Sequence, residues 1–225
     1  MVVECGRVDL ETLRSWLVEG SPHAETLVGS KWIVDYEETD ENGRLKTFRA
    51  ILPKLPLTLL VLGLRGDEKG PYIARLVVET PIDTIDMDPR AKVKLYRRLL
   101  SMNKMALAKY YLYGEDNTVA IVVDLDLKSL SKEEFEDALG TLLMGFMYLS
   151  KLEESFAEML KEKEIQDLGR LVLGYLEKGR SKDEIIRMLI EGGMSGELAK
   201  DIVDTIYRAA RGETPEKPRG DLLRI

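Results

Sequence analysis

The sequence predicts an α+β protein: an antiparallel sheet with helices packed on it, in the order helix, strands, helix, hairpin, long helix. Three observations predict this class. Apolar residues recur at helical spacing from Leu10 to Leu17, and at period two from Val119 to Leu127, which is the alternation of a strand. The Asn42-Gly43 pair between two strand-like segments tolerates the positive φ that a tight hairpin turn demands.

Before residue 80 the sequence predicts one short helix and four strands. Asp9 is a suitable N-cap for the helix, and Gly20-Ser21-Pro22 ends it. The strands are predicted over residues 31–38, 44–52, 57–64 and 72–79. Because segment 57–64 is apolar at nearly every position, we expect this strand to be buried on both faces.

A basic helix, a hairpin and a long helix follow. Asp88-Pro89 predicts the start of the basic helix, since the carboxylate can accept a backbone N–H and proline at the first helical position loses no needed donor. The hairpin strands are predicted over 108–113 and 119–127. Ser131 and Glu134 have the spacing of a capping box, which predicts the start of the long helix.

Both of these helices are predicted to be amphipathic. The packing side of the basic helix is predicted to hold Val93, Tyr96, Leu99, Leu100 and Asn103. The segment from Pro89 to Gly114 contains no acidic residue. Its charged residues are all basic: Arg90, Lys92, Lys94, Arg97, Arg98, Lys104 and Lys109. The long helix is acidic on its outer side, and its apolar stripe is predicted to hold Phe135, Ala138, Leu139, Leu142, Leu143, Phe146, Met147 and Leu149.

This order of elements resembles the type III secretion chaperone-like fold. The resemblance covers residues 1–160 and is strongest over 88–150. The segments that carry it are Leu95-Tyr96-Arg97-Arg98-Leu99-Leu100, Tyr111, Val119-Ala120-Ile121-Val122-Val123 and Ser131-Lys132-Glu133-Glu134. Proteins of that family are small, acidic and usually homodimeric, and they bind segments of other proteins without chemistry. The resemblance therefore implies a non-enzymatic, chaperone-like or adaptor protein that forms a homodimer.

The chain is predicted to contain one main domain and an appendage. Residues 1–160 form the α+β domain, which we expect to fold without the rest because segment 158–164 has few core positions. Residues 161–212 are predicted to form a three-helix interaction module, in which Ser181 and Ser195 cap the last two helices. Residues 213–225 are predicted to be a flexible tail.

Composition indicates a cytoplasmic protein. The net charge of −7 disfavours gross binding to nucleic acid or an anionic membrane. The single Cys5 cannot form an internal disulfide, no signal peptide precedes the first helix, and the apolar segment 55–64 is about half of the ~20 residues needed to span a bilayer. The scarcity of glutamine and asparagine in a chain that is 32% charged is a bias associated with thermophiles.

No catalytic, cofactor or metal site is predicted. The spacing from Gly174 to Ser181 is that of a phosphate loop, but Arg180 stands where lysine is required. Asp124 and Asp126 would share one face of a strand, where a solvated face is commoner than a Mg²⁺ site, and Asp83, Asp86 and Asp88 are better explained by a loop and a cap. With His23 as the only histidine, no histidine-based triad is possible.

The candidate partner-binding residues lie on the basic helix and the first hairpin strand: Arg90, Lys94, Arg97, Arg98, Lys109, Tyr111 and Tyr113. Acidic residues guard the strand over 31–38, so we expect strand 108–113 to be the docking edge of the sheet, for a second copy or a protein partner. The alternative is a nucleic-acid-associated factor that uses the basic helix 89–109 or the C-terminal helices. Those last helices carry eight cations and eight acids, which disfavours phosphate binding there.

Overall fold

The computed structural model describes residues 8–55, 57–67, 70–104, 107–152 and 154–211. Within them lie six helices and a six-stranded antiparallel sheet, so the predicted α+β class and element order are confirmed. In chain order these elements are α1 (Leu10–Val18), β1 (Ile33–Thr39), β2 (Leu45–Leu52), β3 (Leu57–Asp67), β4 (Gly70–Glu79), α2 (Pro89–Met102), β5 (Lys109–Tyr113), β6 (Thr118–Asp126), α3 (Lys132–Ser150), α4 (Glu154–Glu177), α5 (Lys182–Glu191) and α6 (Gly196–Ala210). Cys5 and the predicted flexible tail lie outside the described residues. None of the helices in the described ranges combines the length and the apolar character that a membrane span needs.

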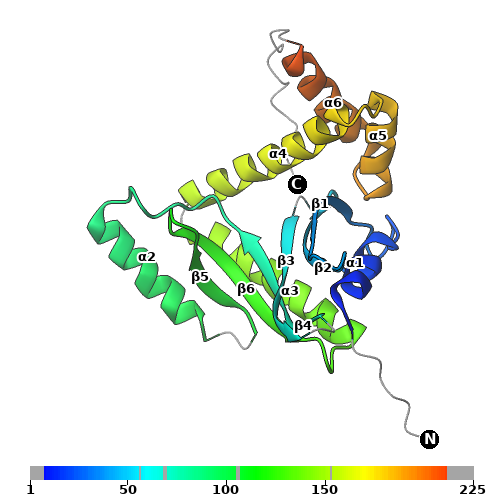
Figure 1. Ribbon diagram of the computed structural model, residues 1–225. Helices are drawn as coiled ribbons and strands as arrows, with labels where there is room; N and C mark the ends of the chain where they lie inside the picture. The colour runs from blue at the N-terminus through cyan, green and yellow to red at the C-terminus, as the bar shows by residue number, and fades with distance from the viewer. Residues whose placement is uncertain (1–7, 56, 68–69, 105–106, 153, 212–225) are drawn as a thin grey trace, which may run out of the picture.

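The strands form one sheet in the order β1-β2-β3-β4-β6-β5, and every neighbouring pair is antiparallel. The chain crosses the sheet from β1 to β4, leaves it to form α2, and returns as the β5–β6 hairpin (Figure 1). β6 therefore lies between β4 and β5, and the two edges of the sheet are β1 and β5, the strands that the sequence indicates as edges.

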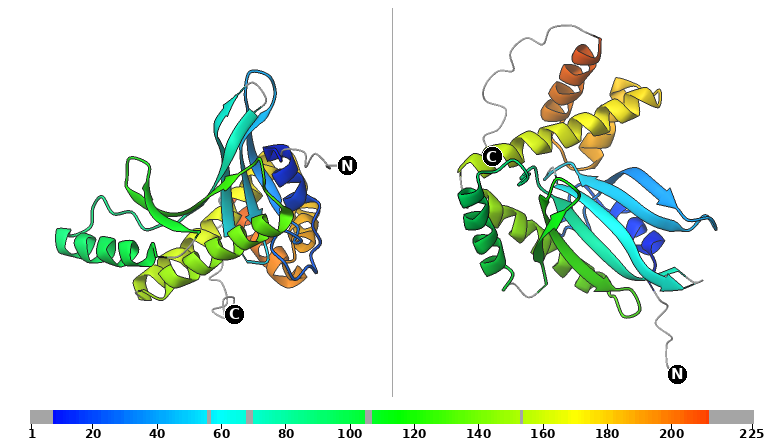
Figure 2. Two further views of the ribbon diagram at one scale, coloured as in Figure 1. Left: turned by 90° about the horizontal axis from the view of Figure 1, so that it is seen from below. Right: turned by 60° about the vertical axis from the view of Figure 1, so that its left-hand side comes forward.

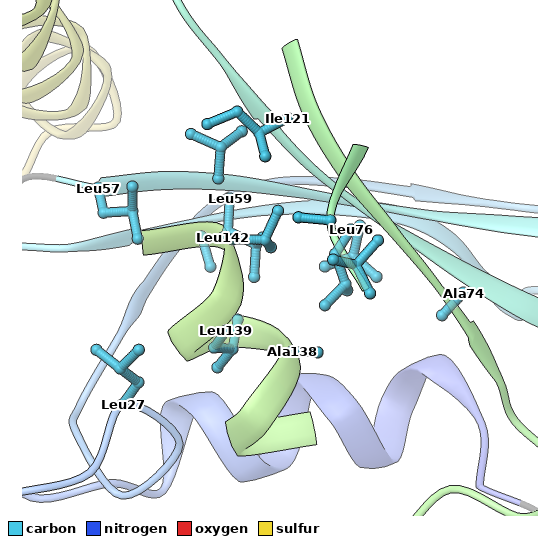
Figure 3. Close-up of a cluster of buried hydrophobic side chains, with 14 of the residues drawn as sticks. Leu27, Leu57, Leu59, Ala74, Leu76, Ile121, Ala138, Leu139 and Leu142 are labelled. Carbon is cyan, nitrogen blue, oxygen red and sulfur yellow. The ribbon is translucent and has the colours of Figure 1, made fainter. Parts of the chain in front are cut away.

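One face of the sheet is covered by α1 and α3. Its largest fully buried side chains include Trp32, Phe48, Ile121 and Phe135. Figure 3 shows the strand residues Leu59, Leu76 and Ile121 clustered with Ala138, Leu139 and Leu142 of α3. Because full burial of one such leucine or isoleucine contributes about 1.5–3 kcal/mol, this layer is the main source of stability.

Local side-chain bonds begin the helices where the sequence predicts. The Thr12 backbone N–H donates to Asp9 Oδ1 at 2.8 Å, and the Arg90 N–H donates to Asp88 Oδ1 at 2.9 Å. At α3 both bonds of the Ser131–Glu134 capping box are present. These bonds satisfy N–H groups that have no partner inside the helix.

Two predicted helix faces are partly wrong. On α2 only Leu95 and Leu99 are buried, whereas Val93 and Leu100 are 49% and 69% exposed. On α3, Met147 is 49% exposed. The reason at α2 is its position beside the β5 edge of the sheet rather than over a face, so that only a narrow stripe of the helix is covered (Figure 1).

The second face of the sheet is covered at one end only. There α4, α5 and α6 pack around Ile33 of β1 and Ile51 of β2. Further along β3, Leu60, Leu62 and Leu64 are only partly buried, so the prediction that this strand is buried on both faces is wrong. The C-terminal helices reach the beginning of β3 and leave the rest of this face uncovered by any described helix.

A buried carboxylate on α4 ties the C-terminal helices to the sheet. Asp167 is 3% exposed, accepts a hydrogen bond from Thr58 Oγ1 at 2.8 Å, and pairs with Lys163 at 3.1 Å. α4 is continuous through the predicted boundary at residue 160. The division into domains at that residue stays a prediction. Removing the chain after residue 160 would expose Ile33 and Ile51, which the C-terminal helices bury.

The turn between α5 and α6 offers a test of this attachment. A Cβ at Gly192 would overlap the ring of Pro53, although the backbone there (φ −78°) suits alanine. We expect Gly192→Ala to lower the free energy of unfolding by about 1–3 kcal/mol, measured by urea denaturation. Gly174→Ala is the control, since a Cβ there meets nothing within 4 Å and removing a mid-helix glycine stabilises by roughly 0.5–1 kcal/mol. Equal effects of the two changes would contradict the close contact at Pro53.

Glu164 predicts a pH dependence of stability. It lies one turn from the buried Leu160 and Leu168, and burial raises the pKa of its carboxyl from 4.5 to about 7. Between these values the folded state binds more protons than the unfolded state, so the free energy of unfolding contributed by this group falls as pH rises through that window. We expect Glu164→Gln, a permanently neutral isostere, to be more stable than the wild type at pH 8 and to gain little at pH 4.5.

Urea denaturation at the two pH values measures this difference. Glu162→Gln removes a carboxylate from an exposed position of the same helix and serves as the control. The same gain from both variants at pH 8 would mean that net charge, rather than burial of Glu164, sets the effect.

Candidate functional site

The uncovered part of the sheet is the candidate functional site. We call this surface the open face, and its residues are Leu60, Leu62, Arg75, Val77, Lys109, Tyr111, Tyr113, Ala120, Val122 and Asp124. The strand register joins them: Leu60 lies opposite Val77, Val77 opposite Val122, and Val122 opposite Lys109. In the left view of Figure 2 the sheet is bent, so that the β5–β6 hairpin and the other strands rise on two sides of this face.

Small apolar side chains form the floor of the open face. Val77 and Ala120 have no exposed surface and Val122 is 7% exposed, although no described helix covers them. The partly buried Leu60, Leu62 and Tyr113 pack against this floor and shield it. A ligand on this face therefore meets the larger leucine and tyrosine side chains first.

Two charged groups of the open face, Arg75 and Asp124, are paired with one another, and the third, Lys109, donates to the backbone oxygen of Asn103 at 3.3 Å. Arg75 donates from Nε and Nη2 to the two carboxylate oxygens of Asp124, both at 2.7 Å, and this bonding raises the pKa of Arg75 above its ordinary value. The guanidinium also lies 5.9 Å from the ring centre of Tyr111, which in turn is 6.3 Å from the ring of Tyr113. The surface consequently offers apolar and aromatic contacts around a neutralised ion pair.

Four of the five acidic residues considered as cation ligands accept hydrogen bonds from other groups. Asp124 is held by Arg75, and Asp126 accepts the backbone N–H of Lys128 at 2.9 Å. Asp83 accepts the N–H of Ile85, and Asp88 caps α2. Over the described ranges, no three or more histidine, cysteine, aspartate or glutamate side chains are grouped so as to hold a metal ion.

The structure divides the predicted partner-binding residues between two surfaces. Lys109, Tyr111 and Tyr113 are alternate residues of β5 and share the open face. Arg90, Lys94 and Arg97 instead project from α2 at exposed positions spaced one and two turns apart. Arg98 turns toward the junction of α3 and α4, where it donates to the backbone oxygen of Leu152 at 3.3 Å. The basic helix and the tyrosines therefore do not form one continuous site through Arg98.

Sequence reasoning missed the contributions of β3 and β4 to this site. Arg75, Val77 and Leu62 read as ordinary strand residues, because nothing local says which face of the sheet stays uncovered. The sequence does contain one signal for this site: Arg75 and Asp124 have opposite charges and stand in strands, where such residues pair if the strands are neighbours. Recognising this pair requires knowing that β4 and β6 are neighbours in the sheet.

The edge at β5 is partly blocked. The side chain of Asn103, which caps the end of α2, accepts the N–H of Tyr110 at 2.6 Å and donates to its C=O at 3.2 Å. Since outward-facing residues alternate along an antiparallel edge, Leu112 is the next whose N–H and C=O point away from β6. The edge therefore offers little backbone for pairing, and the open face offers more surface.

Comparison with known proteins gives a family without a function. A family model described as a domain of unknown function (DUF8183) matches residues 12–152, which run from α1 to the junction of α3 and α4. No curated protein matches the chain in sequence.

Asn103 is predicted to be a structural guard of the β5 edge. Asn103→Ala leaves the outward N–H of the buried Tyr110 without its partner, so we expect a loss of about 1–3 kcal/mol in the free energy of unfolding. Amide hydrogen exchange at Tyr110 should speed up as well. Ser101→Ala, which removes a hydroxyl from an exposed position of the same helix, is the control and should change neither quantity appreciably. Unchanged exchange at Tyr110 in Asn103→Ala would exclude the guarding role.

Proposed function

Because the chain belongs to the DUF8183 family, for which no function is known, we propose its role from the geometry of the open face. The protein is a non-enzymatic, chaperone-like or adaptor protein that binds an apolar segment of another protein on this face, and it acts as a homodimer. The observation that carries the proposal is an uncovered sheet face with leucine and tyrosine side chains around a neutral ion pair.

Contact chemistry supports binding of a polypeptide over catalysis. Tyrosines supply a large, rigid contact area and are enriched where proteins meet. On the open face, Arg75 and Asp124 bind each other in a bidentate pair, and nearer β1 the same holds for Arg49 and Asp35, joined at 2.7 Å. In such pairs each group compensates the charge of the other and is held in a fixed geometry.

The resemblance to secretion chaperones supports the same class. It implies homodimers that hold segments of other proteins without chemistry. The element order on which it was based is that of the structure from α1 to α3. The relation to that family remains part of the proposal.

A nucleic-acid-associated role is the second candidate, and one observation favours it. Arg90, Lys94 and Arg97 are exposed along one side of α2, which has no acidic residue. Phosphate groups bind such a row of cations, and the affinity then falls steeply with salt. Apolar docking on the open face has no comparable dependence.

Two probes separate the candidates: fluorescently labelled reduced and carboxymethylated α-lactalbumin, a permanently unfolded polypeptide, and polyuridine RNA. We expect fluorescence anisotropy to show binding of the polypeptide that changes little between about 50 and 200 mM salt. Tyr111→Ser and Leu62→Ser should each weaken it about tenfold, as loss of a central contact side chain does. Ile190→Ser, at a similarly exposed position on α5, is the matched control.

The RNA probe decides the alternative. Salt-sensitive binding of polyuridine that is lost in the triple variant Arg90→Gln, Lys94→Gln, Arg97→Gln would favour nucleic acid. Polypeptide binding that is unaffected by Tyr111→Ser and Leu62→Ser would remove the open face as the site.

A further inference from the structure

The outer side of α3 carries large apolar side chains that nothing described in the chain covers. Met144, Met147 and Tyr148 are 49%, 49% and 51% exposed, on the side opposite the buried Leu142 and Leu149. Together they form a patch at the C-terminal half of the helix. Such patches on a soluble domain mark sites of association, and methionine adapts well to a partner surface.

Along this side the residues follow the spacing of a helix–helix seam. Steps of four and three residues alternate through Glu133, Asp137, Gly140, Met144, Met147 and Lys151. This series, which we call the α3 seam, reads acidic at its beginning, apolar in its middle and basic at its end. The charged members Glu133, Asp137 and Lys151 are exposed, and none of them forms an ion pair with another described residue.

The α3 seam is complementary to itself when a second copy runs antiparallel. Its spacing is symmetric about Leu142, so Glu133 then lies opposite Lys151 and Gly140 lies opposite Met144. The two-fold axis repeats each contact, which is the property of an isologous dimer interface. Glu133 and Lys151 stand at opposite ends of a 19-residue helix, about 27 Å apart at 1.5 Å per residue, and cannot pair within one chain.

Gly140 leaves room for the close approach of a second helix. A Cβ at this position would meet nothing within 4 Å, so packing inside the chain does not require glycine there. Glycine in a helix interior lowers stability relative to alanine, and it is used where another backbone or side chain comes close. Opposite Met144 of a second copy it provides the hole that receives that side chain.

The surroundings of Lys151 fit the acidic half of a second α3. A surface hollow of about 540 Å³ lies between the ends of α2 and α3, lined by Ser101, Met102, Lys104, Tyr148, Lys151 and Leu152. Two lysines thus flank an apolar groove at the end of the α3 seam. In the antiparallel arrangement this is where Glu133 of the second copy arrives, while Asp137 lies one turn away, opposite Met147.

We propose that the α3 seam is the dimer interface of this protein, with a second copy of the chain packed antiparallel across Gly140 and Met144 and with Glu133 and Lys151 pairing at both ends. This assignment rests on the homodimer of the proposed function. It leaves the open face, on the other side of the sheet from α3, available to a partner segment.

Charge exchange on the full chain tests the interface. Size-exclusion chromatography with light scattering should give twice the 25.5 kDa chain mass for the wild type at tens of micromolar. Glu133→Lys and Lys151→Glu each create two like-charge contacts per dimer and should raise the dissociation constant on the order of tenfold or more. An equimolar mixture of the two variants should restore the dimer, because each chain then supplies the charge that the other needs.

Gly140→Gln is the second variant and should also give monomers, since its side chain fills the hole for Met144. Its thermal unfolding midpoint, taken at monomeric concentration, should not fall, because a Cβ there meets nothing inside the chain. A wild type that stays monomeric overturns the interface and the homodimer together, and polypeptide binding to the open face is then judged on its own probe. A dimer that persists in all three variants overturns the α3 seam and leaves the homodimer standing.

Discussion

The packing of α3 against β6 is the interaction on which the rest of the structure depends. β6 joins the β5 edge to the four strands that precede α2, and its alternate residues Val119, Ile121 and Val123 are buried on the side facing α3. Without that contact the β5–β6 hairpin would hold to the sheet only through its ladder with β4 and the open-face contacts of Arg75 and Val77 with β6, and α2 would lose the edge beside which it lies. The register of β6 also decides which of its side chains appear on the opposite side.

The residues on the opposite side, the open face, follow from strand geometry. Because successive side chains point to opposite faces of a sheet, a strand that buries alternate residues against α3 places the remaining ones on the open face. On β6 the second set is Ala120, Val122 and Asp124. The first two are small and apolar, and the third is neutralised by Arg75 from the neighbouring strand. Covering the apolar part of such a face is favourable, and the C-terminal helices do so at its far end around Ile33 and Ile51.

The two helices that share the covered face of the sheet, α1 and α3, differ in what they leave exposed. α1 is a short helix that buries Leu10, Leu13 and Leu17. α3 buries one side as fully and yet keeps Met144, Met147 and Tyr148 at the surface. If both proposals hold, one layer of the molecule serves self-association and the other serves the partner, so that two copies would present two open faces.

The local elements of this protein were determined by the sequence itself. The caps at Asp9, Asp88, Ser131, Ser181 and Ser195 act through bonds within one helical turn, and the alternation from Val119 to Leu127 needs no distant partner. The α+β class followed from these elements and their order. Lys109, Tyr111 and Tyr113 were predicted to bind a partner as part of the docking strand, and the structure places them on one face because residues two apart on a strand point the same way.

The tertiary structure decided which of the available apolar surfaces are covered. Val93, Leu100 and Met147 have the helical spacing of core residues, and Leu60 and Leu62 have the composition of a strand buried on both sides, yet all of them are partly or largely exposed. Periodicity shows that an apolar side exists, whereas its burial depends on which element arrives there from elsewhere in the chain. The separation of Arg98 from Tyr111, the pairing of Arg75 with Asp124 and the clamp of Asp167 on Thr58 likewise join residues distant in sequence. Only the strand order and the path of α4 bring those groups together or keep them apart, because both are set by packing of the whole chain.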